Sequence, residues 1–342
     1  MEPVIAVIGA TGAVGEVFLR VAAERGLKIK ELRLLASARS EGKTLMYDGK
    51  PITVHEVTRA NLEGADIVFC SADSSVSKQW GPVVREMGGV MIDDGSAYRM
   101  DANVPLVVPE INGDDLEWHE GIVSIPNCTT TPLVMALHAM RTVAPLKRVT
   151  AATYQAVSGT GAAAVRELNA QVEAIGAGRA VPALEVYSQQ IAMNVLPQVD
   201  DFAEDDYTKE ELKMRNETRK ILHLDGLKFA ATCVRVPVAL SHAEAVHVEF
   251  EGPAPIEALK AALRVMPGVV LIEDPTQVIT PLQAANRDEA FVARLRIDPT
   301  VDHGVVFWCV TDNLRKGAAT NAIQIAEELL RRNLVRRPAL KR

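Results

Sequence analysis

Cys128 is the side chain whose setting most clearly predicts chemistry. It lies in Ser124-Ile-Pro-Asn-Cys-Thr-Thr-Thr-Pro132, between an apolar run that predicts a strand and a pattern that predicts a helix. Backbone amides and the positive end of a helix lower the pKa of a thiol and stabilise an oxyanion. Cys70, Cys233 and Cys309 lie inside apolar runs, where a cysteine is ordinarily a small buried hydrophobe. Cys128 is therefore the predicted nucleophile.

A glycine-rich turn near the amino terminus predicts a dinucleotide site. Gly9-Ala-Thr-Gly-Ala-Val-Gly15 follows a β-branched run at 4–8 and opens a helical pattern, so its amides can hold a pyrophosphate. The spacing is Gly-x-x-Gly-x-x-Gly rather than Gly-x-Gly-x-x-Gly, and the alternative is a tight turn without a ligand. Its place at the start of an α/β pattern favours the cofactor. The expected contacts are Gly9, Thr11, Gly12, Ala13, Val14 and Gly15.

The residues after the second expected strand predict NADP rather than NAD. About twenty residues after the glycines, where an NAD site places an acidic residue, the sequence has Ser37, Arg39 and Ser40. A guanidinium and two hydroxyls suit a 2′-phosphate, and the alternative is an exposed arginine in a surface loop. Ser71, at the end of a later strand, is a further candidate cofactor contact.

The order of apolar runs predicts two domains. The first part alternates strands and helices, which predicts a parallel sheet covered on both faces, with a hairpin around Asp48-Gly49 at its edge. From about Lys147 longer strands follow one another closely, which predicts an α+β domain. The expected strands are 4–8, 31–36, 67–70, 90–92, 122–125, 148–156, 228–236, 245–251, 291–297 and 305–310; the expected helices are 12–25, 76–87, 130–143, 162–175, 209–222 and 316–333.

The predicted fold class is α/β, with a Rossmann-type doubly wound parallel sheet and a second α+β domain that carries a largely antiparallel sheet. Residues 1–127 plus 316–342 form the expected NADP-binding domain, and residues 128–315 the expected catalytic and oligomerisation domain. The stretches 177–206 and 273–290 carry Pro, Gly and Asp without a clear period and are expected to be long loops.

Composition and charge exclude several classes of protein. Lys plus Arg number 37 against 44 Asp plus Glu, a net charge of −7, so there is no overall positive field for nucleic acid or an anionic membrane. The cysteines form no Cys-x-x-Cys pair and the histidines no metal-ligand spacing, so neither a disulfide framework nor a metal site is expected. No signal peptide or membrane-spanning run is present, and a cytoplasmic location is expected.

Several segments, taken in order, extend nearly from end to end of the chain. They are Gly9 to Gly15, Ala97-Tyr-Arg99, Pro126-Asn-Cys-Thr129, Tyr154-Gln-Ala-Val-Ser-Gly-Thr-Gly161, Glu210-Glu-Leu-Lys213, Val234-Arg-Val-Pro-Val238, His242 and Asp312-Asn-Leu-Arg-Lys-Gly317. Together they make the chain similar to aspartate-semialdehyde dehydrogenases, and the chain differs at Thr160 and Ala243, where the family more often has Ala and Ser. The resemblance implies reversible, NADP-dependent interconversion of L-aspartate 4-semialdehyde plus phosphate with L-4-aspartyl phosphate. It also implies a thioester on Cys128 and a place in the route to diaminopimelate, lysine, threonine and methionine.

The resemblance also implies a role for each polar residue at the reacting carbonyl. Gln155 orients the acyl intermediate and Asn127 helps to polarise the carbonyl, although a glutamine at a strand end can simply bond to backbone. His242 follows the turn at 237–241, and an imidazole with an unperturbed pKa of about 6.5 suits acid and base steps near neutrality. The alternative is a histidine that only caps a turn. Cofactor contacts implied in the second domain are Ser158, Gly159 and Asn313.

Four charged residues are expected to bind the substrates. Arg235 is an isolated cation in an apolar strand and needs a partner, and the resemblance implies that this partner is the α-carboxylate of the substrate. Glu210 and Lys213 share a helix face, which alone indicates an ordinary surface pair. By resemblance, Glu210 receives the substrate ammonium, and Lys213 and Arg99 bind phosphate.

Three alternatives remain. N-acetylglutamyl-phosphate reductase uses the same chemistry, but its acylated amine has no use for a carboxylate such as Glu210. In a glyceraldehyde-phosphate dehydrogenase, which also has Cys-Thr-Thr, the histidine and an NAD-type acid are expected in other contexts. A non-catalytic NADPH-binding regulator would leave Cys128, Gln155, Arg235 and His242 without a common purpose.

The family resemblance also implies a homodimer or homotetramer that forms through the second domain. The stretch 177–206 can contribute contacts to that interface.

Overall fold

The computed structural model describes residues 2–335 of the chain. The described residues divide into two compact units: unit 1 comprises residues 2–127 and 318–335, and unit 2 comprises Cys128–Gly317. The carboxyl-terminal boundary lies two residues beyond the expected one at 316. Residues 336–342, which the sequence assigned to the first domain, lie outside the described part of the chain.

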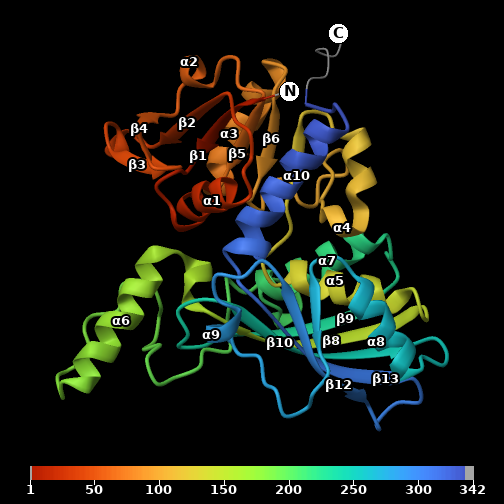
Figure 1. The fold of residues 1–342 in the computed structure, drawn as a ribbon. Helices are drawn as coiled ribbons and strands as arrows, with labels where there is room; N and C mark the ends of the chain where they lie inside the picture. The colour runs from red at the N-terminus through yellow and green to blue at the C-terminus, as the bar shows by residue number, and fades with distance from the viewer. Residues whose placement is uncertain (1, 336–342) are drawn as a thin grey trace. The chain divides into compact units, whose positions relative to one another are not determined.

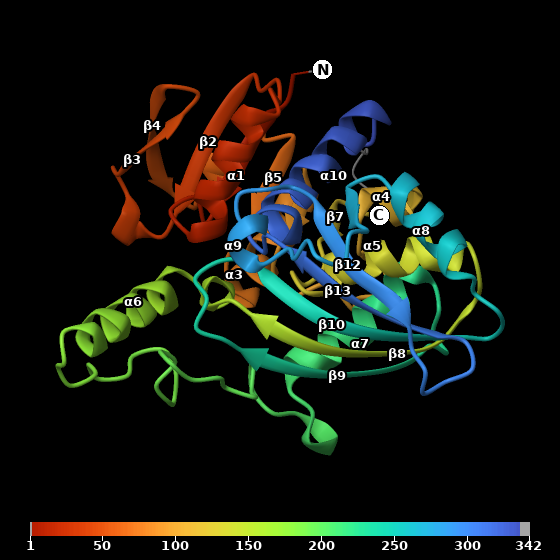
Figure 2. The ribbon, with the colours of Figure 1, turned by 60° about the horizontal axis from the view of Figure 1, so that its bottom comes forward.

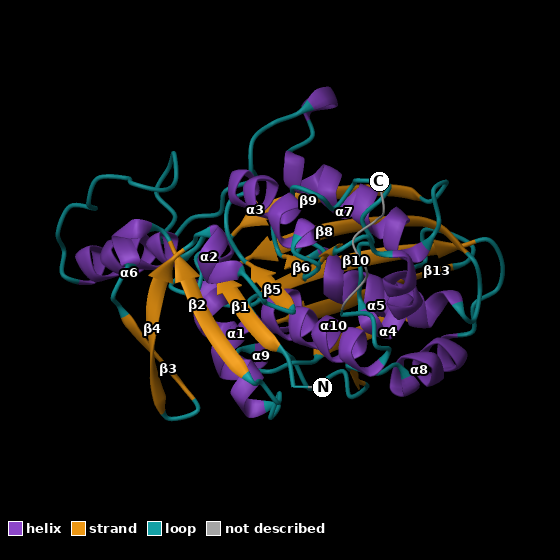
Figure 3. Cartoon of the chain, turned by 90° about the horizontal axis from the view of Figure 1, so that it is seen from above, coloured by secondary structure: helices purple, strands orange, loops and turns teal. Residues whose placement is uncertain are grey.

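Unit 1 contains a seven-stranded sheet in the order β3-β4-β2-β1-β5-β6-β7. Every neighbouring pair is parallel except β3 and β4, which form the expected hairpin at the edge. Figure 3 shows the arrows of β1, β2 and β5 side by side and in one direction. The strands are β1 (Val4–Ile8), β2 (Glu31–Ala36), β3 (Thr44–Tyr47), β4 (Lys50–Glu56), β5 (Ile67–Cys70), β6 (Val90–Asp93) and β7 (Ile122–Ser124).

The helices of unit 1 cover this sheet. Strand β1 is buried along its whole length, and Phe18 of α1 stacks on Phe69 of β5 with ring centroids 4.4 Å apart. Strand β1 lies between β2 on one side and β5 on the other, so the strand order of the sheet reverses at β1. Doubly wound sheets bind ligands at the carboxyl ends of the strands where this reversal occurs. The helices are α1 (Ala13–Glu24), α2 (Arg59–Leu62), α3 (Ser74–Glu86), α4 (Pro109–Asn112) and α10 (Thr320–Arg331).

Unit 2 contains a six-stranded sheet in the order β11-β12-β13-β10-β8-β9. Three neighbouring pairs are antiparallel and two, β11 with β12 and β8 with β9, are parallel. The expectation of a largely antiparallel sheet is confirmed. The strands are β8 (Leu146–Gln155), β9 (Lys228–Arg235), β10 (His242–Phe250), β11 (Val269–Ile272), β12 (Ala290–Ile297) and β13 (Gly304–Thr311).

Helices cover one face of this second sheet. Figures 1 and 2 show α5, α7 and α8 together on that face, while α6 and the chain after it extend away from the strands. The other face carries half-exposed side chains such as Tyr154, whose ring lies 5.5 Å from that of Trp308. The helices of unit 2 are α5 (Thr130–Arg141), α6 (Ala162–Gly176), α7 (Lys209–Leu222), α8 (Ile256–Val265) and α9 (Pro281–Ala284).

The structure differs from the sequence expectations in several places. Strand β10 begins at His242, three residues before the expected start, so His242 belongs to the strand rather than to a turn. Helix α8, strand β11 and the short helices α2, α4 and α9 were not expected, and α9 lies within the stretch 273–290 that was expected to be a loop. The last helix starts with a π-helical turn over Arg315–Ala319 before α10, instead of one helix from 316. Within the described residues no helix is both long and apolar enough to cross a membrane.

Candidate active site

The glycine turn of unit 1 has the geometry of a phosphate cradle. Gly9 has φ +83°, and a Cβ there would lie 2.0 Å from the carbonyl oxygen of Ser71. A Cβ on Gly15 would lie 2.4 Å from the Gly9 oxygen, so both positions require glycine. Gly12 is the N-cap of α1, and the first backbone bond of the helix runs from the Glu16 amide to the Gly12 oxygen at 3.0 Å. The amides of Thr11, Ala13 and Val14 therefore lie at a helix start that fits a pyrophosphate.

The loop after β2 fits a 2′-phosphate. Ser37 and Arg39 are exposed there, and the buried Ser40 hydroxyl lies 3.5 Å from that of Thr11. Lys43, which the sequence analysis did not select, donates to the Ser40 hydroxyl at 3.3 Å. Two cations and several hydroxyls thus surround the position where an NAD site carries an acid.

Ser71 and Arg99 lie on segments tied together in unit 1. The Ser71 hydroxyl donates to Asp94 at 2.8 Å, and an Arg99 Nη donates to the Asp94 carbonyl at 2.8 Å. Burial raises the pKa of the Asp94 carboxyl, while Arg99 and Ser71 act in the opposite direction. The Arg99 guanidinium is itself buried, so its backbone bond fixes the direction of a cation that would otherwise be costly to bury.

Cys128 is the partly exposed cysteine among four. It lies two residues before α5, next to the buried Asn127, and the other three thiols are buried. Burial raises the pKa of Cys70 to about 12 and also raises the pKa values of Cys233 and Cys309. A Cβ on Gly317 would lie 2.9 Å from the Cys128 Cβ, so the backbone of Gly317 packs directly on the nucleophile.

Arg235 and His242 converge at the end of β8, although their strands are not neighbours. Strand β8 lies between β9 and β10, and both side chains bond to Ala156 just beyond it. An Arg235 Nη donates to the Ala156 carbonyl at 2.8 Å, and the Ala156 amide donates to His242 Nδ1 at 3.0 Å. A Cβ on Gly159 would lie 3.0 Å from both Arg235 Nη1 and His242 Nε2. The bare backbone of Gly159 therefore leaves room for both groups.

The environment of His242 corrects the sequence-based argument about its acidity. Burial, and then the nearby Arg235 guanidinium, lower its pKa to about 3, with Glu210 acting in the opposite direction. The ring is therefore neutral at pH 7 in the ligand-free protein, not poised near 6.5 as expected. Its Nδ1 accepts the Ala156 amide, which places the ring proton on Nε2, a buried atom without a hydrogen-bond partner among the described residues.

His247, the other histidine of β10, lies on the opposite face as its odd spacing predicted. It is exposed and bonds to Asp298 at 3.0 Å. It has no place in the arrangement around Ala156, so the imidazole at this end of β8 comes from His242 alone among the described residues.

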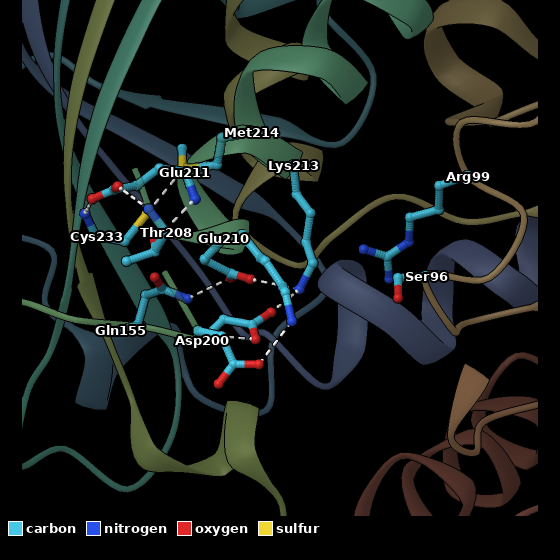
Figure 4. Close-up of polar contacts among 12 residues, drawn as sticks. Ser96, Arg99, Gln155, Asp200, Thr208, Glu210, Glu211, Lys213, Met214 and Cys233 are labelled. Carbon is cyan, nitrogen blue, oxygen red and sulfur yellow. Dashed lines mark hydrogen bonds and ion pairs between the residues drawn. The ribbon is translucent and has the colours of Figure 1, made fainter. Parts of the chain in front are cut away.

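Gln155, Glu210 and Lys213 form one chain of hydrogen bonds (Figure 4). Gln155 Nε2 donates to Glu210 Oε1 at 2.9 Å, and Lys213 Nζ donates to Glu210 Oε2 at 3.2 Å. Glu210 is buried in the first turn of α7, which a Thr208–Glu211 capping box begins. The pair is therefore not the ordinary surface pair that its spacing alone indicates, because one member is buried and bonded to the expected acyl-binding amide.

Ser158 and Asn313, which the resemblance implied as cofactor contacts, meet in unit 2. The Ser158 hydroxyl donates to Asn313 Oδ1 at 3.1 Å, and the Ser241 amide donates to the same oxygen at 2.9 Å. Asn313 Nδ2 is buried and has no partner among the described residues. An orphaned amide donor of this kind fits the carboxamide of a nicotinamide ring.

Asp200 and Gly317 are two further contributors to the site that the sequence analysis did not single out. Asp200 lies in the long loop at 177–206 and binds Lys213 at 2.7 Å. Gly317 is the last residue of the segment Asp312-Asn-Leu-Arg-Lys-Gly317. A glycine directly after the charged start of an expected helix can indicate that another segment packs closely on its backbone. Asp200 had no comparable signal, because it lies thirteen positions before Lys213 in a loop without a regular period.

Two family models together match most of the chain. "Semialdehyde dehydrogenase, NAD binding domain" matches residues 4–119, and "Semialdehyde dehydrogenase, dimerisation domain" matches residues 137–316. An aspartate-semialdehyde dehydrogenase of Aquifex aeolicus is 46% identical over 97% of this chain and 99% of its own length. The chain belongs to the aspartate-semialdehyde dehydrogenase family. The resemblance found in the sequence is confirmed.

Other members of the family agree in sequence and fold. The Bacillus subtilis enzyme is 43% identical over 97% of this chain and 98% of its own length. A crystal structure of aspartate semialdehyde dehydrogenase II from Vibrio cholerae complexed with ASA has a TM-score of 0.94 at 41% identity and covers 97% of this chain and 99% of its own. The fold class expected from the sequence is thereby confirmed, and neither relative carries the name of the alternative reductase.

Proposed function

We propose that this protein catalyses the reversible, NADP-dependent conversion of L-aspartate 4-semialdehyde and phosphate to L-4-aspartyl phosphate. Unit 1 would bind the cofactor, and unit 2 would carry the catalytic groups. The observation that carries the proposal is Cys128: it is partly exposed at the start of α5, whereas the other thiols are buried with raised pKa values. A thiolate there can attack an aldehyde carbon.

Each step then has a group in unit 2 that suits it. The Cys128 thiolate adds to the aldehyde, and the resulting oxyanion accepts a hydrogen bond from Nε2 of neutral His242. Bound NADP supplies the hydride acceptor. Collapse of the oxyanion leaves a thioester, which Gln155 orients and Asn127 helps to polarise. Phosphate attacks the thioester carbon, the thiolate leaves, and the proton of the phosphate goes to solvent.

This role for His242 differs from exchange of a proton near neutrality. With the proton on Nε2 and the pKa lowered to about 3, the ring can donate a hydrogen bond at pH 7 without first becoming charged. Arg235 also disfavours an imidazolium, because its guanidinium and His242 Nε2 both lie against the backbone of Gly159. A neutral donor therefore fits the geometry better than a general base.

The charged residues suit the two ends of the substrate. Arg235 is buried and has one Nη bonded to backbone, so it would present its remaining donors to the α-carboxylate. Glu210 would receive the ammonium, and Lys213 would bind phosphate. Arg99 remains our proposed second phosphate ligand on the strength of the resemblance.

NADP is the proposed cofactor because Ser37 and Arg39, and no acid, directly follow β2. Arg39 and Ser37 are exposed there, Lys43 bonds to Ser40, and no acidic residue stands between 36 and 40. A family structure from Candida albicans, 25% identical with a TM-score of 0.75, is described as having NADP. These observations support a 2′-phosphate at this loop.

We also propose that the protein is a homodimer that uses the face of the second sheet opposite α5, α7 and α8. The family model for unit 2 is described as a dimerisation domain. That face carries Tyr154, and the extension formed by α6 and 177–206 exposes several large apolar side chains. Light scattering that finds a monomer at micromolar concentration would rule this out. The exposed apolar residues of the extension are Val172, Ile175, Leu184, Met193, Val195 and Phe202.

The activity is tested by the absorbance of NADPH. The purified protein should reduce NADP with L-aspartate 4-semialdehyde at a rate that depends on phosphate. The N-acetylated glutamate semialdehyde should be a poor substrate, since its amide cannot pair with Glu210. Cofactor binding without turnover of either aldehyde would instead support the regulator alternative.

A further inference from the structure

Lys213 lies between two carboxylates, and the activity proposed above explains only one of them (Figure 4). Its ammonium is 3.2 Å from Glu210 Oε2 and 2.7 Å from Asp200 Oδ2. The shorter contact is thus to Asp200, a residue with no place in the expected site. A buried amide, Gln155, bonds to the other oxygen of Glu210, so Glu210 is held from both sides.

The turn that carries Asp200 is built to aim it at Lys213. Asp200 has φ +69°, and its Oδ1 accepts the amide of Asp201 at 2.8 Å, which leaves Oδ2 for the ammonium. The backbone of Asp201 in turn accepts the Lys209 amide at 2.8 Å, which fastens the turn to the start of α7. Asp and Asn are the side chains that tolerate this left-handed backbone best.

The ion pair between Lys213 and Asp200 is exposed enough for an anion from solvent to exchange with Asp200. The side chains of Lys213 and Asp200 are 26% and 31% exposed, so the pair is partly shielded but open to ions from solvent. Although burial alone raises the pKa of Asp200, the bonds from Lys213 and the Asp201 amide bring it below its ordinary value. Asp200 is therefore a carboxylate at neutral pH.

We propose that Asp200 occupies the Lys213 ammonium in the absence of phosphate and thereby sets the affinity of the site for that anion. The proposal rests on the function proposed above, in which Lys213 binds phosphate. A phosphate dianion that reaches Lys213 meets two carboxylates at the same ammonium. It must displace Asp200 or bind beside its charge, and either costs affinity.

The variant Asp200→Asn removes the charge with the least other change. Asn keeps the size of the side chain, its oxygen can still accept the Asp201 amide, and it tolerates the same backbone. We expect the KM for phosphate to fall about fivefold, the size of effect that fits a charge near a partly exposed site. The KM for NADP and the melting temperature should stay close to those of the wild type.

The chain offers a matched control in Asp201→Asn. Asp201 lies on the same turn and pairs with a lysine of the same helix, Lys209, at 2.7 Å. The variant makes the same change in net charge one residue away, without touching Lys213. It should leave the KM for phosphate unchanged. An equal fall in both variants would mean that general charge, not the Asp200 contact, controls the affinity, and would overturn the proposal.

Phosphate titrations of wild type, both Asn variants and Lys213→Ala separate the possible failures. If Lys213→Ala leaves the KM for phosphate unchanged, the assignment of Lys213 is wrong and the role of Asp200 falls with it. If Lys213→Ala raises that KM while Asp200→Asn does not lower it, only the role of Asp200 is wrong. A rise in KM together with a lower melting temperature in Asp200→Asn would show a positioning role instead.

Discussion

Replacement of Gly317 by alanine should move the nucleophile without changing any reactive group. The added Cβ would lie 2.9 Å from the Cys128 Cβ and 3.2 Å from its Cα. Ordinary carbon contacts lie at about 3.5–4.0 Å, so Cys128 or the segment ending at Gly317 must move by about 0.6 Å or more. Gly317 has no positive φ, so the contact rather than backbone strain causes the effect.

A displacement of this size should lower kcat by about 10- to 100-fold, since misplacement by about 1 Å can cost a hundredfold. Overpacking should also lower the free energy of unfolding by about 1–3 kcal/mol. Steady-state kinetics and the rate of Cys128 alkylation by iodoacetamide measure the first effect, and urea denaturation the second. Gly176→Ala at the end of α6 is the control, because a Cβ there meets no heavy atom within 4 Å. Turnover and alkylation of Gly317→Ala within twofold of the wild type would refute the close packing.

Three further predictions concern acidity and cofactor choice. His242→Asn should lower turnover about a hundredfold, because it removes the Nε2 donor to the oxyanion. The pKa of His242 is about 3 in the folded protein and about 6.5 in the unfolded chain, so between these values the unfolded chain binds the extra proton. The wild type should thus lose up to about 1.4 kcal/mol per pH unit relative to His242→Asn as pH falls from 6.5 to 4.5, and parallel urea midpoints would count against the neutral ring. Glu244 is buried with both carboxylate oxygens unpaired among the described residues, and burial raises its pKa. Glu244→Gln should therefore increase the free energy of unfolding more at pH 8 than at pH 5. A larger increase at pH 5 would show that the carboxylate has a partner. Arg39→Asp should raise the KM for NADP far more than that for NAD, whereas equal changes would show that Arg39 does not meet a 2′-phosphate.

The sequence predicted the first sheet well because its strands are continuous apolar runs bounded by glycine or polar turns. Strand β1 and the glycines after it were placed to the residue, since a fully buried parallel strand has no competing pattern. Helix α8 was missed although Ile256, Leu259 and Leu263 have helical spacing, so the signal was present. The early start of β10 was not readable, because Ser241-His242 looks like a polar turn until burial at the end of β8 is known.

The sequence predicts site residues where the chemistry requires a particular type of side chain. It does not predict properties or contacts that depend on which segments meet in the folded protein. An isolated arginine in an apolar strand indicated Arg235, and the structure gives it the Ala156 carbonyl. The lowered pKa of His242 depends on burial and on Arg235 in a strand that is not its neighbour, and no local pattern encodes either. Asp200 reaches Lys213 from a loop without periodicity, so its contact follows only from the folded chain.

The identity of the acylated residue decides whether the proposed mechanism holds. The protein should be mixed with NADP and L-aspartate 4-semialdehyde without phosphate, quenched in acid and digested for mass spectrometry. We expect one aspartyl group on the peptide that contains Cys128, and its disappearance when phosphate is added. An acyl group on Cys70, Cys233 or Cys309, or full activity of Cys128→Ala, would contradict the mechanism.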